Sequence, residues 1–353
     1  MAPFPLLLTD LLGKFGAYLV FLAIGLTFGY VLESSGFNHS PTLAAQFYFK
    51  DLRVFKVFFT AIVVGMLMIF TTAALGILDY NLIWVNPTYL WSGIVGGLIM
   101  GVGFILGGFC PGTSLVALAT LKLDGVFFVL GGLVGVFTFS ETVGFFDHFF
   151  EGSNFGRLTL MEFFNLPTGV IVIGVTLMAL FMLWGGEKLE IMIGKKAPNT
   201  EPKARYIGAG VFVVVAVAIA LIGQPTTLDR WNKLAIEKQP QLEERVYQIH
   251  PGELLNTMHD HKINLVMLDV RSEADYNLFH LRNAQQIVPT QVPDLIAEFH
   301  GEPANTVFVV MSNDEAAATT AWKTMVAESV PNAYILDGGI NGWLDIFAGE
   351  FEG

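Results

Sequence analysis

Gly107-Gly108-Phe109-Cys110-Pro111-Gly112-Thr113-Ser114 interrupts a long apolar stretch and contains the only cysteine of the chain. The residues before it are apolar and rich in glycine, and an apolar segment follows that is too short to cross a bilayer, which takes about 20 residues. Backbone leaves a helix at membrane depth only where protein or a water-filled cavity satisfies its polar groups. We therefore predict a re-entrant turn beside a pathway, with Cys110 at its tip.

An earlier stretch of the chain repeats this pattern. A shift of 72 residues places 35–45, Ser-Gly-Phe-Asn-His-Ser-Pro-Thr-Leu-Ala-Ala, over 107–117, and Lys50 then falls over Lys122. In this alignment Asn38 occupies the position of Cys110. The sequence thus predicts two copies of a unit made of a helix, a break and a short helix.

Composition separates a membrane part from a soluble part. Of the 353 residues 53% are hydrophobic and only 14% are charged, which is unusual for a soluble protein. Residues 1–223 carry 11 Lys and Arg against 12 Asp and Glu, whereas residues 224–353 carry 8 against 19. An acidic soluble part lacks the basic surface that nucleic acid requires, so nucleic acid is not expected as a partner.

The apolar runs predict about six membrane spans and two short re-entrant helices within a domain of residues 1–223. The expected spans are 15–32, 54–78, 89–109, 126–146, 168–184 and 206–222, and the short helices are 41–49 and 112–121. The first run lacks a charged leader and a cleavage site, so we expect a retained span and no signal peptide. Residues 224–245 are expected to form a polar linker.

Membrane orientation depends on what the breaks do. If each helix and its break make one crossing, the lysine-rich loops lie together and the C-terminal domain faces outward; if each break turns the chain back, the positive charges divide evenly. The second arrangement would relate the repeats by inversion, a common transporter plan, and it is the one the sequence analysis favours. The positive charges therefore do not decide the orientation, and the side of the C-terminal domain stays open, with the cytoplasmic side favoured.

The two breaks are the candidate binding site. Short helices that begin at membrane depth would direct unpaired N–H groups and the positive ends of their dipoles at an anion. Glycines let backbone approach a ligand, while hydroxyl, amide and thiol groups can donate hydrogen bonds to it. The alternative is that the glycines only pack helices and the hydroxyls bond back to their own turns. The candidate residues are Cys110, Asn38, Gly36, Gly108, Gly112, Thr113, Ser114 and Ser40.

On the stretches 29–38 and 107–113, roughly residues 15–146 resemble the YeeE/YedE family of bacterial thiosulfate transporters. Longer members often carry the pair of breaks twice, so the resemblance implies a half-length chain that a homodimer or a sister subunit would complete. It also implies that Cys110 passes thiosulfate onward through S–H···S contacts. Asn38 stands where the family's first cysteine would be, which argues against a relay of several thiols within one subunit.

Residues 246–353 show alternating strand and helix signals, and this α/β part is similar to rhodanese domains. The resemblance lies in 268–284, which opens Leu-Asp-Val-Arg, and in Leu-Asp-Gly-Gly-Ile-Asn-Gly-Trp at 336–343. It implies a cysteine after the strand 307–311, but the residue there is Ser312, followed by Asp314 and Glu315. Serine cannot hold a persulfide, so we predict no catalysis, with Asp269 and Arg271 forming a buried ion pair.

Together these features predict a multi-pass protein of the bacterial inner membrane that carries thiosulfate or a related anion past Cys110. No cofactor and no metal are expected, and the rhodanese-like domain would regulate transport or dock a soluble sulfur carrier. Two alternatives stay open at this point: a membrane-anchored sulfurtransferase, and a scaffold that docks a sulfur carrier.

Overall fold

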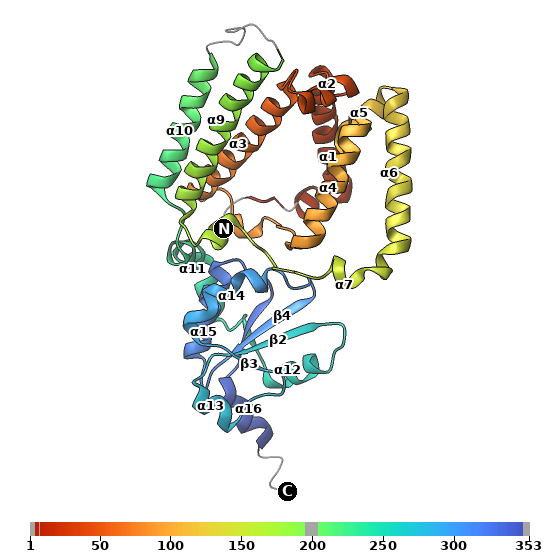
Figure 1. The fold of residues 1–353 in the computed structure, drawn as a ribbon. Coiled ribbons are helices and arrows are strands. Elements are labelled where there is room, and N and C mark those ends of the chain that lie inside the picture. Colours follow the sequence, from red (N-terminus) through yellow and green to blue (C-terminus); the bar gives the residue numbers. More distant parts are fainter. Residues whose placement is uncertain (1–3, 7, 195–203, 349–353) are drawn as a thin grey trace. The chain divides into compact units, whose positions relative to one another are not determined.

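The chain divides into two units, one of helices and one built on a parallel sheet. The computed structural model describes residues 4–6, 8–194 and 204–348 (Figure 1). The membrane unit comprises Pro3–Leu78 and Pro87–Gln224, and the C-terminal unit comprises Pro225–Gly353 together with the segment Asp79–Asn86. This is the predicted fold class: a helical membrane bundle followed by an α/β domain.

The membrane unit contains six segments that are long and apolar enough to cross a membrane, within the described residues. Their helices are α1 (Leu8–Ser34), α3 (Arg53–Ala74), α4 (Leu90–Gly107) with α5 (Pro111–Ala119), α6 (Leu123–Thr142), α9 (Thr168–Met192) and α10 (Ala204–Ile222). Shorter elements complete the unit: α2 (Ser40–Ala44), the 3-10 helices η1 (Ala45–Tyr48) and η3 (Val143–Phe145), α7 (Asp147–Phe150) and α8 (Leu160–Phe164).

The predicted repeat is present in the structure. A shift of 72 residues carries α1, α2 with η1, and α3 onto α4, α5 and α6. The first helix of each copy ends at a glycine in the left-handed region, Gly36 with φ 74° and Gly108 with φ 72°, where a residue without Cβ is favoured. The copies differ after this point, because α2 has five residues before it tightens into η1, whereas α5 has nine.

Contacts along α4, α5 and α6 show that α4 and α5 form one crossing and α6 the return. Tyr89, just before α4, stacks on Phe150 beyond the end of α6, with ring centroids 6.4 Å apart. At the other end of α4, a Cβ on Gly107 would lie 2.4 Å from the ring of Phe128, early in α6. Figure 1 shows α5 leading from α4 to the start of α6. The expectation that the break turns the chain back is therefore wrong for this copy.

The first copy runs in the same direction as the second. The backbone of Phe4, before α1, donates a 3.1 Å hydrogen bond to Ile77, after α3, so these two helices are antiparallel. The break after α1 packs on the break after α4, because a Cβ on Gly108 would lie 2.8 Å from Cβ of Ser40. Both breaks thus lie at one end of the unit, which we call the break end. The repeats are parallel, not inverted.

Helices α9 and α10 form a further antiparallel pair beside α3. Glu190, near the end of α9, accepts a 2.6 Å hydrogen bond from the backbone of Leu52 at the start of α3. At the opposite end of the pair, a Cβ on Gly169 would lie 2.5 Å from Cα of Ala220 in α10. Helix α9 therefore ends at the break end, and α10 ends at the opposite end, which we call the linker end.

The C-terminal unit is a parallel five-stranded sheet covered by helices on both faces. Its strands are β1 (Gln248–Ile249), β2 (Asn264–Asp269), β3 (Gln285–Gln286), β4 (Thr306–Met311) and β5 (Ala333–Leu336), in the order β1-β5-β4-β2-β3. Phe308 and Val310 face a core shared with α14 (Val292–Phe299) and α15 (Ala316–Ala327). Val309 and Met311 alternate with them and face α12 (Pro251–Met258) and α16 (Gly339–Phe347).

The stretch expected to be a polar linker is instead a helix of the C-terminal unit. Helix α11 (Thr227–Glu243) starts at a capping box in which Thr226 and Asp229 bond to each other's backbone N–H groups. Leu242 is buried in the core of the sheet, and Trp231 packs edge-on against Trp322 with centroids 6.1 Å apart. The C-terminal unit therefore begins near residue 225.

Candidate functional site

Cys110 occupies the N-terminal cap of α5. Its Sγ accepts the backbone N–H of Thr113 over 3.4 Å, and Oγ1 of Thr113 accepts the N–H of Cys110 over 3.1 Å. This reciprocal pair is a capping box in which sulfur replaces the usual hydroxyl. The thiol is half-buried. A sulfur atom is therefore held at the positive end of a nine-residue helix.

The hydroxyl groups of this turn bond back to the turn itself. Thr113 Oγ1 lies 3.2 Å from the carbonyl oxygen of Cys110, and Ser114 Oγ donates to the carbonyl of Pro111 over 2.8 Å. Thr113 and Ser114 are 1% and 2% exposed. For these two residues the structure matches the alternative interpretation of the sequence. Of the predicted donors in the second break, the thiol is the one that reaches a partly exposed position.

The first break packs directly on the second copy of the repeat. Asn38 is buried, and its carbonyl oxygen accepts a 3.1 Å hydrogen bond from Nζ of Lys122, just before α6. Ser40 Oγ donates to the carboxylate of Asp124 over 2.7 Å. The predicted residues Asn38, Ser40 and Gly108 thus come together. Gly36 and Gly112 have open space at the position of a Cβ.

The two breaks differ by one residue in length. In the first break the cap residue of the short helix is His39, three positions after Gly36. In the second break it is Cys110, two positions after Gly108. Asn38 therefore matches Cys110 when counted from the glycine but not when counted from the helix start, so their side chains are not equivalent.

An apolar core shared by the repeats supports the breaks. The equivalent aromatic residues Phe37 and Phe109 are 1% and 0% exposed, and they belong to one cluster with Leu32, Leu43, Val54 and Ala117. Phe109 also packs edge-on against Phe128 at 5.8 Å between centroids. The position of each break is thus fixed by side chains from both copies.

A buried ion pair at the break end was not predicted from the sequence. Glu190, 1% exposed, lies 2.7 Å from Nζ of Lys56 and also accepts the backbone N–H of Leu52, the cap position of α3. The expected span ended at Trp184, but α9 continues to Met192. The spacing of Glu187 and Glu190, three residues apart, is typical of one helix face and could have indicated that the helix continues past Trp184. This pair fastens the chain leaving the first break to α9.

Ser312 stands at the end of β4, and its side chain is turned into the protein. Its Oγ donates to the carbonyl of Asp314 and accepts the N–H of Ala318 over 3.1 Å, in the first turn of α15. The residue is 2% exposed. A hydroxyl in this position holds the start of α15.

The acidic residues after Ser312 occupy the groups that an anion would need. Asp314 accepts the N–H of Ala316 over 2.9 Å, and Glu315 accepts the N–H of Gly338 over 2.7 Å. Arg245 forms ion pairs with Glu315 and Asp337. The hydrogen bond to Glu315, followed by that to Asp337, raises the pKa of Arg245 above its ordinary value. The carboxylates of the loop thus bind N–H groups that an external anion would otherwise use.

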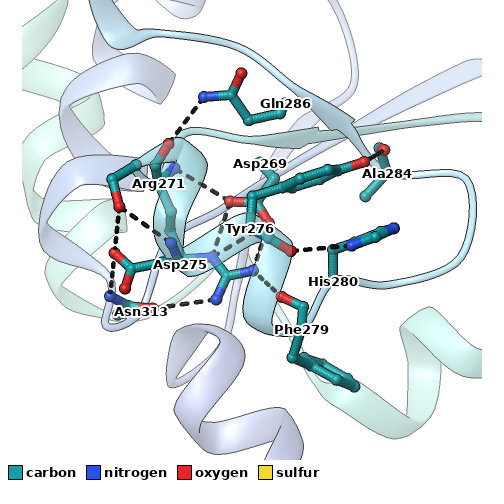
Figure 2. A network of polar contacts seen from close by, with 10 residues as sticks. Asp269, Arg271, Asp275, Tyr276, Phe279, His280, Ala284, Gln286 and Asn313 are labelled. Carbon is teal, nitrogen blue, oxygen red and sulfur yellow. Dashed lines mark hydrogen bonds and ion pairs between the residues drawn. The ribbon is translucent and has the colours of Figure 1, made fainter.

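The predicted ion pair of Asp269 and Arg271 is confirmed, and it connects several loops (Figure 2). Arg271 Nη2 lies 2.7 Å from Oδ2 of Asp269, and the two side chains are 5% and 0% exposed. The same guanidinium donates to the carbonyl of Phe279 over 2.6 Å and to Oδ1 of Asn313 over 3.2 Å. Arg271 therefore links the end of β2 to the residue after Ser312.

The described residues contain no group of three or more His, Cys, Asp or Glu side chains placed to hold a metal ion.

The profile of the Sulphur transport family matches residues 35–237, more than half of the chain. The chain belongs to the sulphur transport family. In this family context the membrane unit is a multi-pass transporter concerned with sulfur, with a sulfur-containing anion as its substrate.

The profile of the rhodanese-like domain matches residues 250–346 of this sulphur transport protein, as its sheet and loops indicated. A comparison with curated proteins finds no match. Among solved structures, one that aligns is an uncharacterized protein from Saccharomyces cerevisiae, 16% identical, which covers 29% of this chain and 94% of its own, with a TM-score of 0.25.

Proposed function

We propose that the protein carries thiosulfate, or a sulfur anion of similar size and charge, across the membrane along a pathway that passes Cys110. The observation that supports this most directly is the half-buried thiol at the start of α5, in the turn on which the first break packs. A thiol at the positive end of a helix can donate a weak hydrogen bond to an anion and release it easily.

The remaining side chains of the proposed site act as supports. Gly108 lets Ser40 approach the second break, and Gly36 permits the sharp turn of the first. Thr113 and Ser114 fix the turn that presents Cys110, while Gly112 leaves open space beside it. We assign substrate contact to Cys110 and Gly112, with Asn38 at the edge of the site.

We further propose that the transport pathway is completed by a second copy of the chain or by a sister subunit. Helix α4 carries Gly93, Gly96, Gly97, Gly101 and Gly103, each with no atom within 4 Å of an added Cβ. Within the window of α6 that would span the membrane, no residue is buried in the monomer. Close approach of a neighbouring helix is the usual use of small residues in membranes.

The rhodanese-like domain is proposed to be inactive as a sulfurtransferase and to regulate transport or dock a partner such as a soluble sulfur carrier. Ser312 is buried and doubly hydrogen-bonded, and the neighbouring N–H groups are already bound to Asp314 and Glu315. Purified full-length protein should release no thiocyanate from thiosulfate and cyanide above the level of a Cys110→Ser variant. Release that survives this substitution would overturn the proposed inactivity.

Uptake of labelled thiosulfate into proteoliposomes tests the role of Cys110. Cys110→Ala removes both the thiol and the helix cap, and the loss of the cap should lower the stability of the protein by about 1 kcal/mol. Cys110→Ser removes the thiol but keeps an oxygen that can cap the helix. Both variants should lose uptake, and the serine variant should retain the thermal stability of the wild type. Undiminished uptake by the serine variant would contradict passage by way of the thiol.

A further inference from the structure

Lysine and arginine residues of the membrane unit gather at the break end. They are Lys50, Arg53, Lys56, Lys122, Lys188 and Arg205 among the residues that the structure describes. Contacts across the helices place them at the same end: Arg205 pairs with Glu187 at 2.7 Å, and Lys56 pairs with Glu190 at 2.7 Å. All of these positions belong to short loops or to the helix turns next to them.

The linker end is poor in positive charge. Of the lysines and arginines that the structure describes in residues 1–223, only Lys14 and Arg157 lie at this end. Helix α10 finishes here, because Ala220 lies against Gly169 at the start of α9 and Gln224 donates to the carbonyl of Phe70 near the end of α3 over 3.3 Å. The chain therefore enters the C-terminal unit from the linker end.

A second connection places the same unit on that side. The segment Asp79–Asn86 joins the end of α3 to the start of α4, both at the linker end, and it belongs to the C-terminal unit. Asn81 Nδ2 donates to Glu328 Oε2 over 2.6 Å, and Ser329 Oγ donates to Asp79. A bilayer cannot separate groups in direct contact, so this loop and the rhodanese-like domain share one side of the membrane.

We infer that the break end faces the cytoplasm and that the rhodanese-like domain lies on the opposite, extracytoplasmic side. Short loops rich in lysine and arginine stay in the cytoplasm, whereas long domains cross largely regardless of their charge. The positive residues of α11, Arg230, Lys233 and Lys238, belong to such a long domain. This placement is opposite to the cytoplasmic one expected from the sequence.

This placement restricts the partners of the rhodanese-like domain. A soluble sulfur carrier confined to the cytoplasm could not reach it, so a partner must be an extracytoplasmic protein or anion. The domain would then meet a substrate outside the cell membrane, before uptake or after export. The inference does not depend on which sulfur anion is carried.

Labelling of single cysteines in the full-length protein tests the orientation. In a Cys110→Ser background, Lys262→Cys marks the C-terminal unit, Asn154→Cys the linker end and Lys50→Cys the break end; all three side chains are exposed. Intact cells of a Gram-negative host are treated with a membrane-impermeant maleimide. We expect labelling of the variants at 262 and 154, and less than a tenth of that labelling at 50.

Permeabilised cells provide the control, because all three cysteines should then react to a similar extent. Labelling of Lys50→Cys alone in intact cells would overturn the inference, and so would equal labelling of all three. The readout is accessibility and not transport, so a failure here would leave the proposal about Cys110 standing. A loss of uptake in Cys110→Ser would equally leave the orientation unaffected.

Discussion

Cys110 and Ser312 occupy comparable positions in the two units, and the difference between them is instructive. Each lies at the start of a helix, and each side chain accepts an N–H from the first turn of that helix. Cys110 is half-buried and is followed by Pro111, Gly112 and Thr113, none of which is acidic. Ser312 is buried and is followed by two acids that bind the nearby N–H groups. The N–H groups of Cys110 and Thr113 bond within their own turn, to Thr113 Oγ1 and Cys110 Sγ, whereas the N–H groups of Ala316 and Gly338 are bound by carboxylates.

The largest loss of uptake should come from a substitution at Gly108, where the two breaks pack together near Cys110. Gly108→Ala puts a side chain at φ 72° and within 2.8 Å of Ser40 Cβ, so the first break must move. Thiosulfate uptake should fall to background. Gly36→Ala is the matched control, because φ is 74° there but the space is open; its cost should be the backbone strain of about 1–2 kcal/mol. Equal loss of uptake in both variants would show that packing between the breaks is not decisive.

The C-terminal unit should lose stability when the ion pair of Asp269 and Arg271 is broken. Arg271→Leu leaves the buried carboxylate of Asp269 without its cation, which should destabilise the C-terminal unit by about 3–5 kcal/mol. Thermal unfolding of the full chain, followed by proteolysis of the C-terminal unit, measures the change. The exposed Arg282→Leu is the control and should shift stability by less than about 0.5 kcal/mol. Similar melting of the two variants would contradict the structural role of Arg271.

The comparison predicts that a cysteine at position 312 can transfer sulfur only when Asp314 and Glu315 are also removed. Ser312→Cys alone, in a Cys110→Ser background, should show no transfer of sulfur from thiosulfate to cyanide. Adding Asp314→Ala and Glu315→Ala frees the N–H groups of Ala316 and Gly338, and this combination should give measurable thiocyanate. Activity from the single cysteine variant would show that the acids do not block the loop.

The smallest effect concerns a third cap, at the start of α11. The hydrogen bond from the Thr226 hydroxyl, the largest cause, lowers the pKa of Asp229 below its ordinary value of 3.8. The stabilisation is therefore complete above this ordinary value and is lost as the pH falls through the lower folded value. The melting temperature of the wild type should exceed that of Asp229→Asn slightly at pH 7, and the difference should vanish near pH 2. A constant difference across this range would contradict the assignment.

Much of this arrangement was accessible from the sequence because apolar runs, glycines and prolines mark helices and their ends directly. The strand before Ser312, both breaks and the ion pair of Asp269 with Arg271 were predicted. The direction of the repeats was not, because it depends on contacts such as Gly107 with Phe128, between residues in different helices. Polar residues led to two wrong predictions. Residues 224–245 were expected to be a linker, although α11 buries an apolar side, and the span ending at Trp184 was drawn too short to include Glu190, whose partner Lys56 is distant in sequence.

The extra residue in the first break has a consequence for attempts to restore symmetry. One residue corresponds to about 100° of rotation around a helix axis, so the side chain at 38 leaves its turn in a different direction from the one at 110. Replacing Asn38 by cysteine would add sulfur without recreating the geometry of Cys110. A genuine twin of that thiol can arise only where an identical break exists, and association of two identical chains would supply it.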